Sequence, residues 1–355
     1  MSDLSMSEIR ISAVDYAACR ADLLSFRNAN RETPRDETYL GWRYERRPNT
    51  LKPIIVFSAN GTGRKIGCLS VTPHDYAIGS HTCSIGILGD ISVDKDWRGK
   101  GIAEGMINYL NGLHAFQNLA AGVVLPNEAA ARSLSKCGWQ TVTKLRRYVK
   151  ILNVEATLEG WFGETWLTTR LAALPNYFLQ ACSAENSLEP SPDYTWKSTD
   201  VLDRRLDRLW DECGKSGNVI GIRDHDHLTW RYLSHPLEKY RAFLLLKRSQ
   251  LCGYVMFHVS EGRCHIDDWL CRDGNSCYVH LLSYFTKYIR KDPAVSSISI
   301  LINEQHAVRS ALRKLGFIKR PDYLRCMVKP HPALSGSDAT LNPAAWFLTA
   351  GDKDV

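Results

Sequence analysis

The sequence predicts an α+β fold in which two similar domains follow one another along the chain. At 355 residues, the chain is too long for one typical hydrophobic core and suits two. Strand-like and helix-like runs alternate through both halves, and a block of the first half recurs in the second. Together these observations favour a tandem of two related mixed domains.

The recurring block is W-R-Y-x-x-x-P, which occupies 42–48 and again 230–236. Two strand-like segments follow each copy. Further along, 127–139 and 303–317 each run from an Asn to a Gly-aromatic pair. Because these features keep one order in both halves, we interpret them as an internal repeat. The W-R-Y triplets are expected to define the fold, with an aromatic acceptor site as the alternative.

In the first half, hydrophobic periodicity and turn residues place the elements in order. A strand is expected at 9–14 and a helix at 15–28, with Asp15 as its N-cap. The remaining expected elements are strands near 53–58, 64–72, 75–78 and 82–93, a helix at 101–115, a strand at 119–125, a helix at 127–137, and a strand at 141–151 that closes the sheet.

Composition and charge narrow the class of protein. A net charge of +7 suits an anionic ligand, but the basic residues are dispersed and form no aromatic-basic platform, so we expect no nucleic-acid partner. The sequence contains no apolar run near the ~18 residues of a membrane span, and its N-terminus lacks signal-peptide features. The eleven cysteines are scattered without a C-x-x-C pair, which indicates reduced thiols and a cytoplasmic protein.

The most informative segment is 98–103, which joins a strand-like run at 87–93 to a helix-like run that begins near Gly101. Small residues at such a turn allow close approach of a ligand, and a helix N-terminus offers free N–H groups and a positive dipole end. Arg98 and Lys100 add positive charge. The segment therefore predicts binding of a pyrophosphate.

This R-x-x-G-x-A segment, together with the block at 127–139, resembles the acyl-CoA loop of the GNAT acyltransferase superfamily. The resemblance implies two GNAT-like domains, each a mixed, mostly antiparallel sheet flanked by helices. The second half has no such loop at 271–277, so the resemblance implies that only the first binds acyl-CoA. The expected division is an N-terminal domain at 1–154, a helical linker at 155–192, a degenerate domain at 193–329, and a tail at 330–355 that docks on the protein.

The resemblance also implies which residues contact acyl-CoA, with acetyl-CoA as the expected form. The pantetheine would pair with the strand edge, and the pyrophosphate would meet the N–H groups of the loop; no metal is implied. The implied set is Ile91, Ser92, Val93, Arg98, Gly99, Lys100, Gly101, Ile102, Ala103 and Asn127.

The sequence indicates the catalytic residues less directly than the residues that contact acyl-CoA. Asp90 lies in an apolar strand, where burial would raise its pKa and let it accept a proton or hold an ammonium; a structural carboxylate is the alternative. The family's acidic Tyr is replaced by Leu134, so Ser133, Ser135 or water would have to protonate the thiolate. His74 and His81 flank the preceding hairpin and are candidates to line the acceptor mouth.

The resemblance implies an acyl-CoA-dependent N-acyltransferase acting on a primary amine. Tandem members of this kind suggest a small-molecule acceptor, such as an amino sugar or a nucleotide amino sugar in surface-polysaccharide synthesis. Two alternatives remain open: a protein or peptide N-acetyltransferase, and a non-catalytic CoA-binding sensor or scaffold.

Overall fold

The computed structural model describes residues 9–154, 177, 179, 183–187, 191–213, 219–272, 274–331 and 337–353. Most of the predicted helical linker at 155–192 therefore lies outside the described residues. Among the described residues, no helix is long and apolar enough to cross a bilayer.

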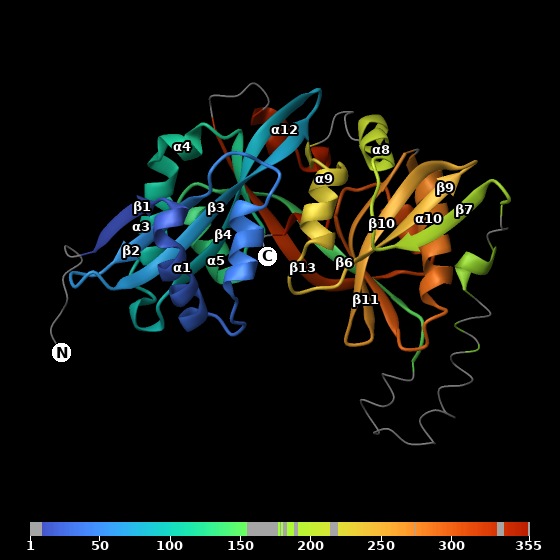
Figure 1. Cartoon of the computed structure of the whole chain (residues 1–355), viewed down its shortest axis with the longest axis horizontal. Coiled ribbons are helices and arrows are strands. Elements are labelled where there is room, and N and C mark those ends of the chain that lie inside the picture. The colour runs from blue at the N-terminus through green and yellow to red at the C-terminus, as the bar shows by residue number, and fades with distance from the viewer. Residues whose placement is uncertain are drawn as a thin grey trace, which may run out of the picture.

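The first half forms an α+β domain whose elements follow the expected order (Figure 1). The expected strands at 64–72 and 75–78 are one continuous strand. The elements are β1 (Arg10–Val14), α1 (Tyr16–Asn30), α2 (Glu37–Leu40), a π-helical turn (Gly41–Glu45), β2 (Ile54–Ala59), β3 (Lys65–Ile78), β4 (His81–Val93), α3 (Ile102–Gly112), α4 (His114–Gln117), β5 (Ala121–Val124), α5 (Glu128–Lys136) and β6 (Gln140–Ile151).

The second half repeats this plan in the same order. Its elements are β7 (Tyr194–Thr199), α8 (Arg205–Cys213), β8 (Val219–Gly221), α9 (His225–Leu228), a π-helical turn (Thr229–Leu233), β9 (Arg241–Lys247), β10 (Gln250–Ser260), β11 (Arg263–Cys271), α10 (Gly274–Ile289), β12 (Ser297–Asn303), α11 (Arg309–Lys314) and β13 (Ile318–Pro330). The tail adds α12 (Ser337–Leu341), β14 (Trp346–Phe347) and a 3-10 turn (Ala350–Asp352).

Helices cover both faces of the first sheet, because successive side chains of β2 are buried in two different hydrophobic clusters. Ile55 and Phe57 are buried in the cluster formed with α1, whereas Val56 is buried in the cluster formed with α3. Successive side chains of a strand point to opposite faces, so an uninterrupted apolar run such as β2 is expected for a sheet covered twice. The N-cap of α1 is Asp15, whose carboxylate accepts from Ala17 N at 2.9 Å.

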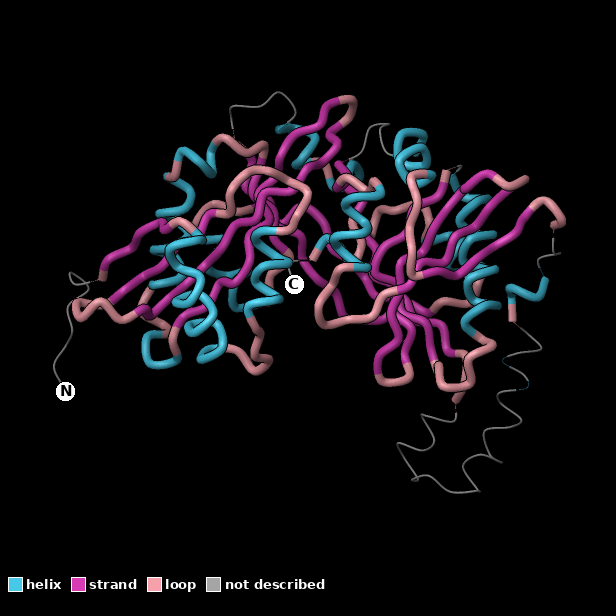
Figure 2. The backbone as a smooth tube through the Cα atoms, viewed as in Figure 1, coloured by secondary structure: helices cyan, strands magenta, loops and turns pink. Residues whose placement is uncertain are grey.

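The two halves exchange strands and share one continuous sheet (Figures 1 and 2). The strand order is β1-β2-β3-β4-β5-β13-β6-β12-β11-β10-β9-β7. The last strand of the second half, β13, lies between β5 and β6 of the first half, and β6 pairs on its other side with β12. The expectation that 141–151 closes the sheet is therefore wrong, because both edges of β6 pair with strands of the second half.

The two W-R-Y copies meet at the interface between the halves. Trp42 Nε1 donates to the carbonyl of Trp230 at 2.8 Å, and Trp230 Nε1 donates to the carbonyl of Trp42 at 2.8 Å. The two indole rings stack with centroids 5.4 Å apart. Each copy thus satisfies the buried donor of the other, so the contact between the two copies is reciprocal.

The C-terminal tail packs between the halves. Trp346, Phe347 and Leu348 are buried, and β14 pairs in parallel with β8, which also pairs with β3. Trp346 Nε1 donates to Thr340 O at 2.9 Å, which satisfies the polar atom of this buried ring. The tail thereby ties the long hairpin of the first half to the second half.

One pair of cysteines departs from the expected reduced state. Cys271, at the end of β11, forms a disulfide with Cys277 in the first turns of α10, with the two Cα atoms 6.2 Å apart. The short turn between strand and helix brings the two side chains together, which their spacing of six in the sequence did not reveal. Cys19, Cys68, Cys83, Cys137, Cys264 and Cys326 are free thiols.

Candidate functional site

A cleft opens where β4 and β5 diverge. The two strands pair in parallel at Gly86↔Gly122 and Ile87↔Val123, after which β4 continues to Val93 while β5 ends. Glycine is required at the contact point, because a Cβ at Gly122 would lie 2.5 Å from the Phe116 ring. The β4 backbone beyond Ile87 therefore leaves an edge on the cleft that can pair with a ligand.

The loop after β4 leads into the N-terminus of α3. Gly99 and Gly101 have φ values of +77° and +74°, which favour glycine, and a Cβ at either position would meet no atom within 4 Å. No side chain caps α3 at Gly101. Free N–H groups and the positive end of the helix dipole therefore face open space.

A cavity of about 830 Å³ lies in front of this loop. It is lined by nine of the ten residues predicted to contact acyl-CoA, the exception being Lys100, whose ammonium lies 4.8 Å from the centroid of the Trp97 ring. Besides Arg98, the cations Arg132 and Lys136 line the cavity. The nine are Ile91, Ser92, Val93, Arg98, Gly99, Gly101, Ile102, Ala103 and Asn127.

Two polar residues of this cavity have structural partners. Asn127 caps α5 by accepting from Ala130 N at 2.9 Å. The Ser133 hydroxyl lies 2.9 Å from a Glu104 carboxylate oxygen, to which it donates. Ser133 thus lines the loop cavity and contacts an acid of α3.

A second cavity, of about 260 Å³, adjoins the first and shares Ile91, Asn127 and Ala130 with it. Asp90 and Arg31 also line it. Ser133 does not, which places its hydroxyl on the loop side of the shared residues.

Asp90 lies among cations at a bulge of β4, where its own φ is +50°. Its carboxylate is 3.3 Å from Arg27, 3.5 Å from Arg31 and 3.4 Å from Arg43, and it accepts from the Tyr44 hydroxyl at 2.7 Å. Burial alone would raise the pKa of Asp90, but the three guanidinium groups and the Tyr44 hydrogen bond together lower it. The expectation of a raised pKa is wrong because the sequence did not reveal this cluster of arginines.

A third cavity, of about 310 Å³, extends the cleft into the second half and shares Leu125, Leu324 and Lys353 with the second. Arg231 of the second W-R-Y copy lines it, as does Lys353 of the tail. The sequence analysis placed Arg231 in the site only under its alternative of an aromatic acceptor site, and it did not assign Lys353. The repeat itself marked Arg231, but no sequence pattern indicates where the end of a tail will lie.

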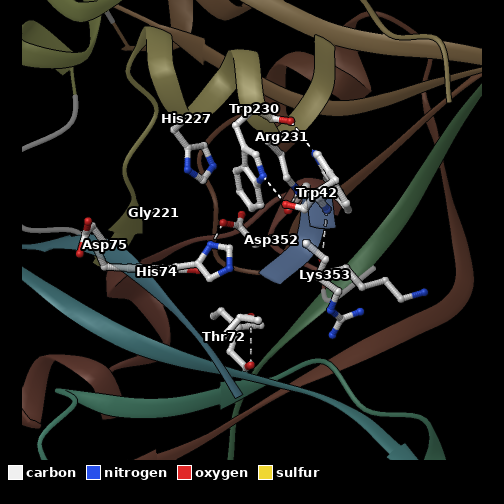
Figure 3. A pocket seen from close by; sticks show the side chains of 14 residues that line it. Trp42, Thr72, His74, Asp75, Gly221, His227, Trp230, Arg231, Asp352 and Lys353 are labelled. Atoms are coloured by element: carbon white, nitrogen blue, oxygen red, sulfur yellow. Dashed lines mark hydrogen bonds between the residues drawn. The ribbon is translucent and has the colours of Figure 1, made fainter. Parts of the chain in front are cut away.

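Neither His74 nor His81 lines any of these three cavities. His74 is enclosed in a small cavity with His227 and Trp230, at ring distances of 6.3 and 5.6 Å (Figure 3). Burial, followed by the neighbouring His227 and Arg47, lowers the pKa of His74 well below its usual value. His81 is exposed and pairs with Ile78 at the opposite end of β4 from Val93.

The equivalent region of the second half is filled by its own side chains. Trp269 at the end of β11 contacts Tyr278 of α10, His306 after β12 and Phe347 of the tail, with ring centroids 5.0, 5.1 and 5.0 Å apart. The disulfide closes the strand-to-helix turn beside these rings. Within the described ranges, no three His, Cys, Asp or Glu side chains gather as a metal site requires.

Comparisons with known proteins agree with this geometry. Residues 52–141 match the family described as Acetyltransferase (GNAT) domain. A comparison with curated proteins gives no match.

Solved structures match the fold over nearly the whole chain. A probable N-acyltransferase from Enterococcus faecalis V583 is 13% identical with a TM-score of 0.64, covering 91% of this chain and 73% of that one. A GCN5-related N-acetyltransferase from Anabaena variabilis ATCC 29413 is 14% identical with a TM-score of 0.62, and the match covers 90% of this chain and 72% of that one. A GCN5-related N-acetyltransferase from Kribbella flavida is 11% identical with a TM-score of 0.55, and the match covers 92% of this chain and 72% of that one. At such identities the likeness establishes the fold.

The family match covers the strands and the loop that build the cleft. Residues 52–141 of this chain are therefore similar to the GNAT acetyltransferase domain family.

Proposed function

We propose that this protein transfers an acyl group, in the first instance acetyl, from acyl-CoA to the primary amine of a small molecule. The observation that carries the proposal is the cleft that runs from the glycine loop at α3 to the divergence of β4 and β5. Its elongated path suits a co-substrate with anionic phosphates at one end and a thioester at the other.

The residues of the loop cavity fit such a molecule. The N–H groups of 98–103 would bind the pyrophosphate, with Arg98, Arg132 and Lys136 supplying charge for the phosphates. The backbone edge of Ile91 to Val93 would pair with the pantetheine amides. These contacts bring the thioester toward the second cavity, beside Asp90.

In the reaction, the amine nitrogen attacks the thioester carbonyl, the carbon–sulfur bond breaks, and CoA leaves as a thiolate. A backbone N–H of the β4 bulge is suited to stabilise the oxyanion. Three guanidinium groups around one Asp90 carboxylate leave net positive charge beside the cavity. Positive charge favours the neutral, nucleophilic form of an amine and stabilises the departing thiolate.

This chemistry reassigns the two predicted catalytic residues. Asp90, with its lowered pKa, suits a positioning role: it holds Arg31 at the cavity wall and accepts the Tyr44 hydrogen bond. The hydroxyl of Ser133 already donates to Glu104, so we propose that the amine proton leaves through water.

The acceptor is proposed to be a small amine, with an amino sugar or nucleotide amino sugar as the first class to screen. Cavities of about 260 and 310 Å³ between the two halves favour a small molecule over a peptide chain. A role in surface-polysaccharide synthesis is a further proposal.

The first experiment is calorimetric titration of acetyl-CoA into wild type, Gly101→Glu and Gly79→Glu. Both glycines have positive φ and open space where a Cβ would stand, so both substitutions carry similar backbone strain, but Gly79 lies at the far tip of the β3–β4 hairpin. A carboxylate beside the pyrophosphate should weaken acetyl-CoA binding at least about fivefold, because like charges about 4 Å apart repel by roughly 1–4 kcal/mol.

Binding that survives in Gly79→Glu and is lost in Gly101→Glu supports the proposed site. Equal binding by all three proteins, or none by wild type, contradicts it. Thiol release from acetyl-CoA with a panel of amines then tests turnover. Tight acetyl-CoA binding with no release for any amine would favour a CoA-binding sensor.

A further inference from the structure

Arg231 is a buried guanidinium that lacks an acidic partner among the described residues. The residue is 5% exposed; its Nε donates to Gly351 O at 3.0 Å and its Nη2 to Lys353 O at 3.1 Å. Its Nη1 is buried and has no hydrogen-bond partner in the described part of the chain. None of the ion pairs between described residues includes Arg231. Burying such a charge without a counter-charge is costly, which indicates that an anion completes the site.

The repeat supplies an internal comparison. Arg43 occupies the same position of the first W-R-Y copy, and its guanidinium lies 3.4 Å from the Asp90 carboxylate. Arg223, another buried arginine of the second half, pairs with both Asp268 and Asp352. Arg231 therefore differs both from its repeat counterpart and from its neighbour in having no carboxylate of the described residues beside it.

The cavity of about 310 Å³ beside Arg231 has excess positive charge. Lys353 lines it and is exposed, and Arg147 lines it while donating to Ser299 Oγ at 3.0 Å and pairing with Asp322 at 2.8 Å. The carboxylate of Asp267, on the same wall, lies 2.5 Å from His258 Nδ1. An anionic group would thus meet positive charge without displacing an internal ion pair.

Resting on the proposed N-acyltransfer, we propose that the acceptor amine also carries a carboxylate or phosphate, and that Arg231 binds this anionic group with the help of Lys353. The third cavity holds the anionic end, and the second cavity holds the amine beside Ile91, where the thioester lies. Lys353 lines both cavities and so marks the path between them. Apolar residues that include Leu125 and Leu324 form the wall between the two ends.

The test uses pairs of amines that differ in the anionic group: glucosamine against glucosamine 6-phosphate, and tyramine against tyrosine. Calorimetry on the acetyl-CoA complex measures binding, and thiol release measures kcat/KM. Wild type should favour the anionic member of at least one pair by about tenfold or more, because a hydrogen bond to a charged group contributes that factor. The pair that responds distinguishes phosphate from carboxylate.

Arg231→Gln should remove this preference while acetyl-CoA binding stays unchanged, and Arg231→Lys should restore part of it. Lys353 is exposed, so Lys353→Gln should fold even if the Arg231 variants do not. It should weaken binding of the anionic amine of each responding pair a fewfold. Arg248→Gln is the control, since Arg248 forms an exposed ion pair with Asp193 remote in the fold.

The proposal is overturned if neither anionic member binds better than its neutral partner, or if Arg231→Gln and Lys353→Gln leave the preference intact. Because binding is measured separately, a preference for the anionic member without thiol release would refute the transfer reaction and keep the anion site.

Discussion

Replacing Asp90 by Asn should destabilise the protein severely. The carboxylate neutralises part of the charge of Arg27, Arg31 and Arg43 and accepts from Tyr44. An amide keeps the size but removes the negative charge, leaving buried cations without a counter-charge. Removing one partner of a buried ion pair typically costs about 3–5 kcal/mol, a large part of the 5–15 kcal/mol by which folded proteins are stable.

Urea unfolding at pH 7, followed by tryptophan fluorescence, measures this cost. Asp193→Asn is the control, because Asp193 pairs with Arg248 at the surface and its loss should barely move the midpoint. Tyr44→Phe keeps the Asp90 charge but removes a hydroxyl that hydrogen-bonds both Asp90 and Ser70 Oγ, and it should cost an intermediate amount, about 1.5–3 kcal/mol. A loss below about 1 kcal/mol in Asp90→Asn would refute the argument that the carboxylate compensates the arginines.

The pH dependence gives a second readout of the same cluster. The pKa of Asp90 is lowered in the folded state, so its ionised form contributes stability above the unfolded-state pKa of about 4. That contribution is lost as the pH falls from about 4 through the folded-state pKa. Wild type should therefore lose stability more steeply than Asp90→Asn below pH 4. Parallel curves for the two proteins would contradict the lowered pKa.

Three further substitutions test the packing around the cleft and the interface. Gly122→Ala places a Cβ 2.5 Å from the Phe116 ring and should cost about 1–3 kcal/mol by overpacking, measured as a lower urea midpoint. Trp42→Phe leaves the Trp230 carbonyl unpaired and should cost about 1–3 kcal/mol, with faster hydrogen exchange confined to the interface. Phe347→Ala should cost about 3–5 kcal/mol and lower Tm, while acetyl-CoA binding persists because the ring lies in the second half. If any of the three variants is as stable as wild type, the contact that it alters does not stabilise the fold.

The local elements could be predicted from the sequence because short-range signals encode them. Asp15 and Asn127 cap their helices as their positions before apolar runs indicate. The conformations of Gly99 and Gly101 follow from their place between a strand and a helix. These signals depend on residues a few positions apart, and a single sequence contains them.

The remaining features depend on contacts that no local pattern records. The arginines around Asp90 come from α1, the residue that caps its C-terminus and the first π-helical turn, at least 47 residues before Asp90 in the sequence. The tail position that brings Lys353 to the cleft depends on packing of Phe347 against Trp269 of the second half. The lowered pKa of Asp90 and the third cavity could therefore be recognised only in the tertiary structure.

The strand exchange has a consequence for synthesis on the ribosome. The edge of β5 acquires its partner only when β13, residues 318–330, has been made, nearly two hundred residues later. Until then the nascent first half presents an unpaired apolar strand, the kind of edge that promotes aggregation. At about 5–20 residues per second, this exposure lasts roughly 10–40 seconds. Expression of residues 1–154 alone would make the exposure permanent, so the two halves are expected to reach their native state only as one translated unit.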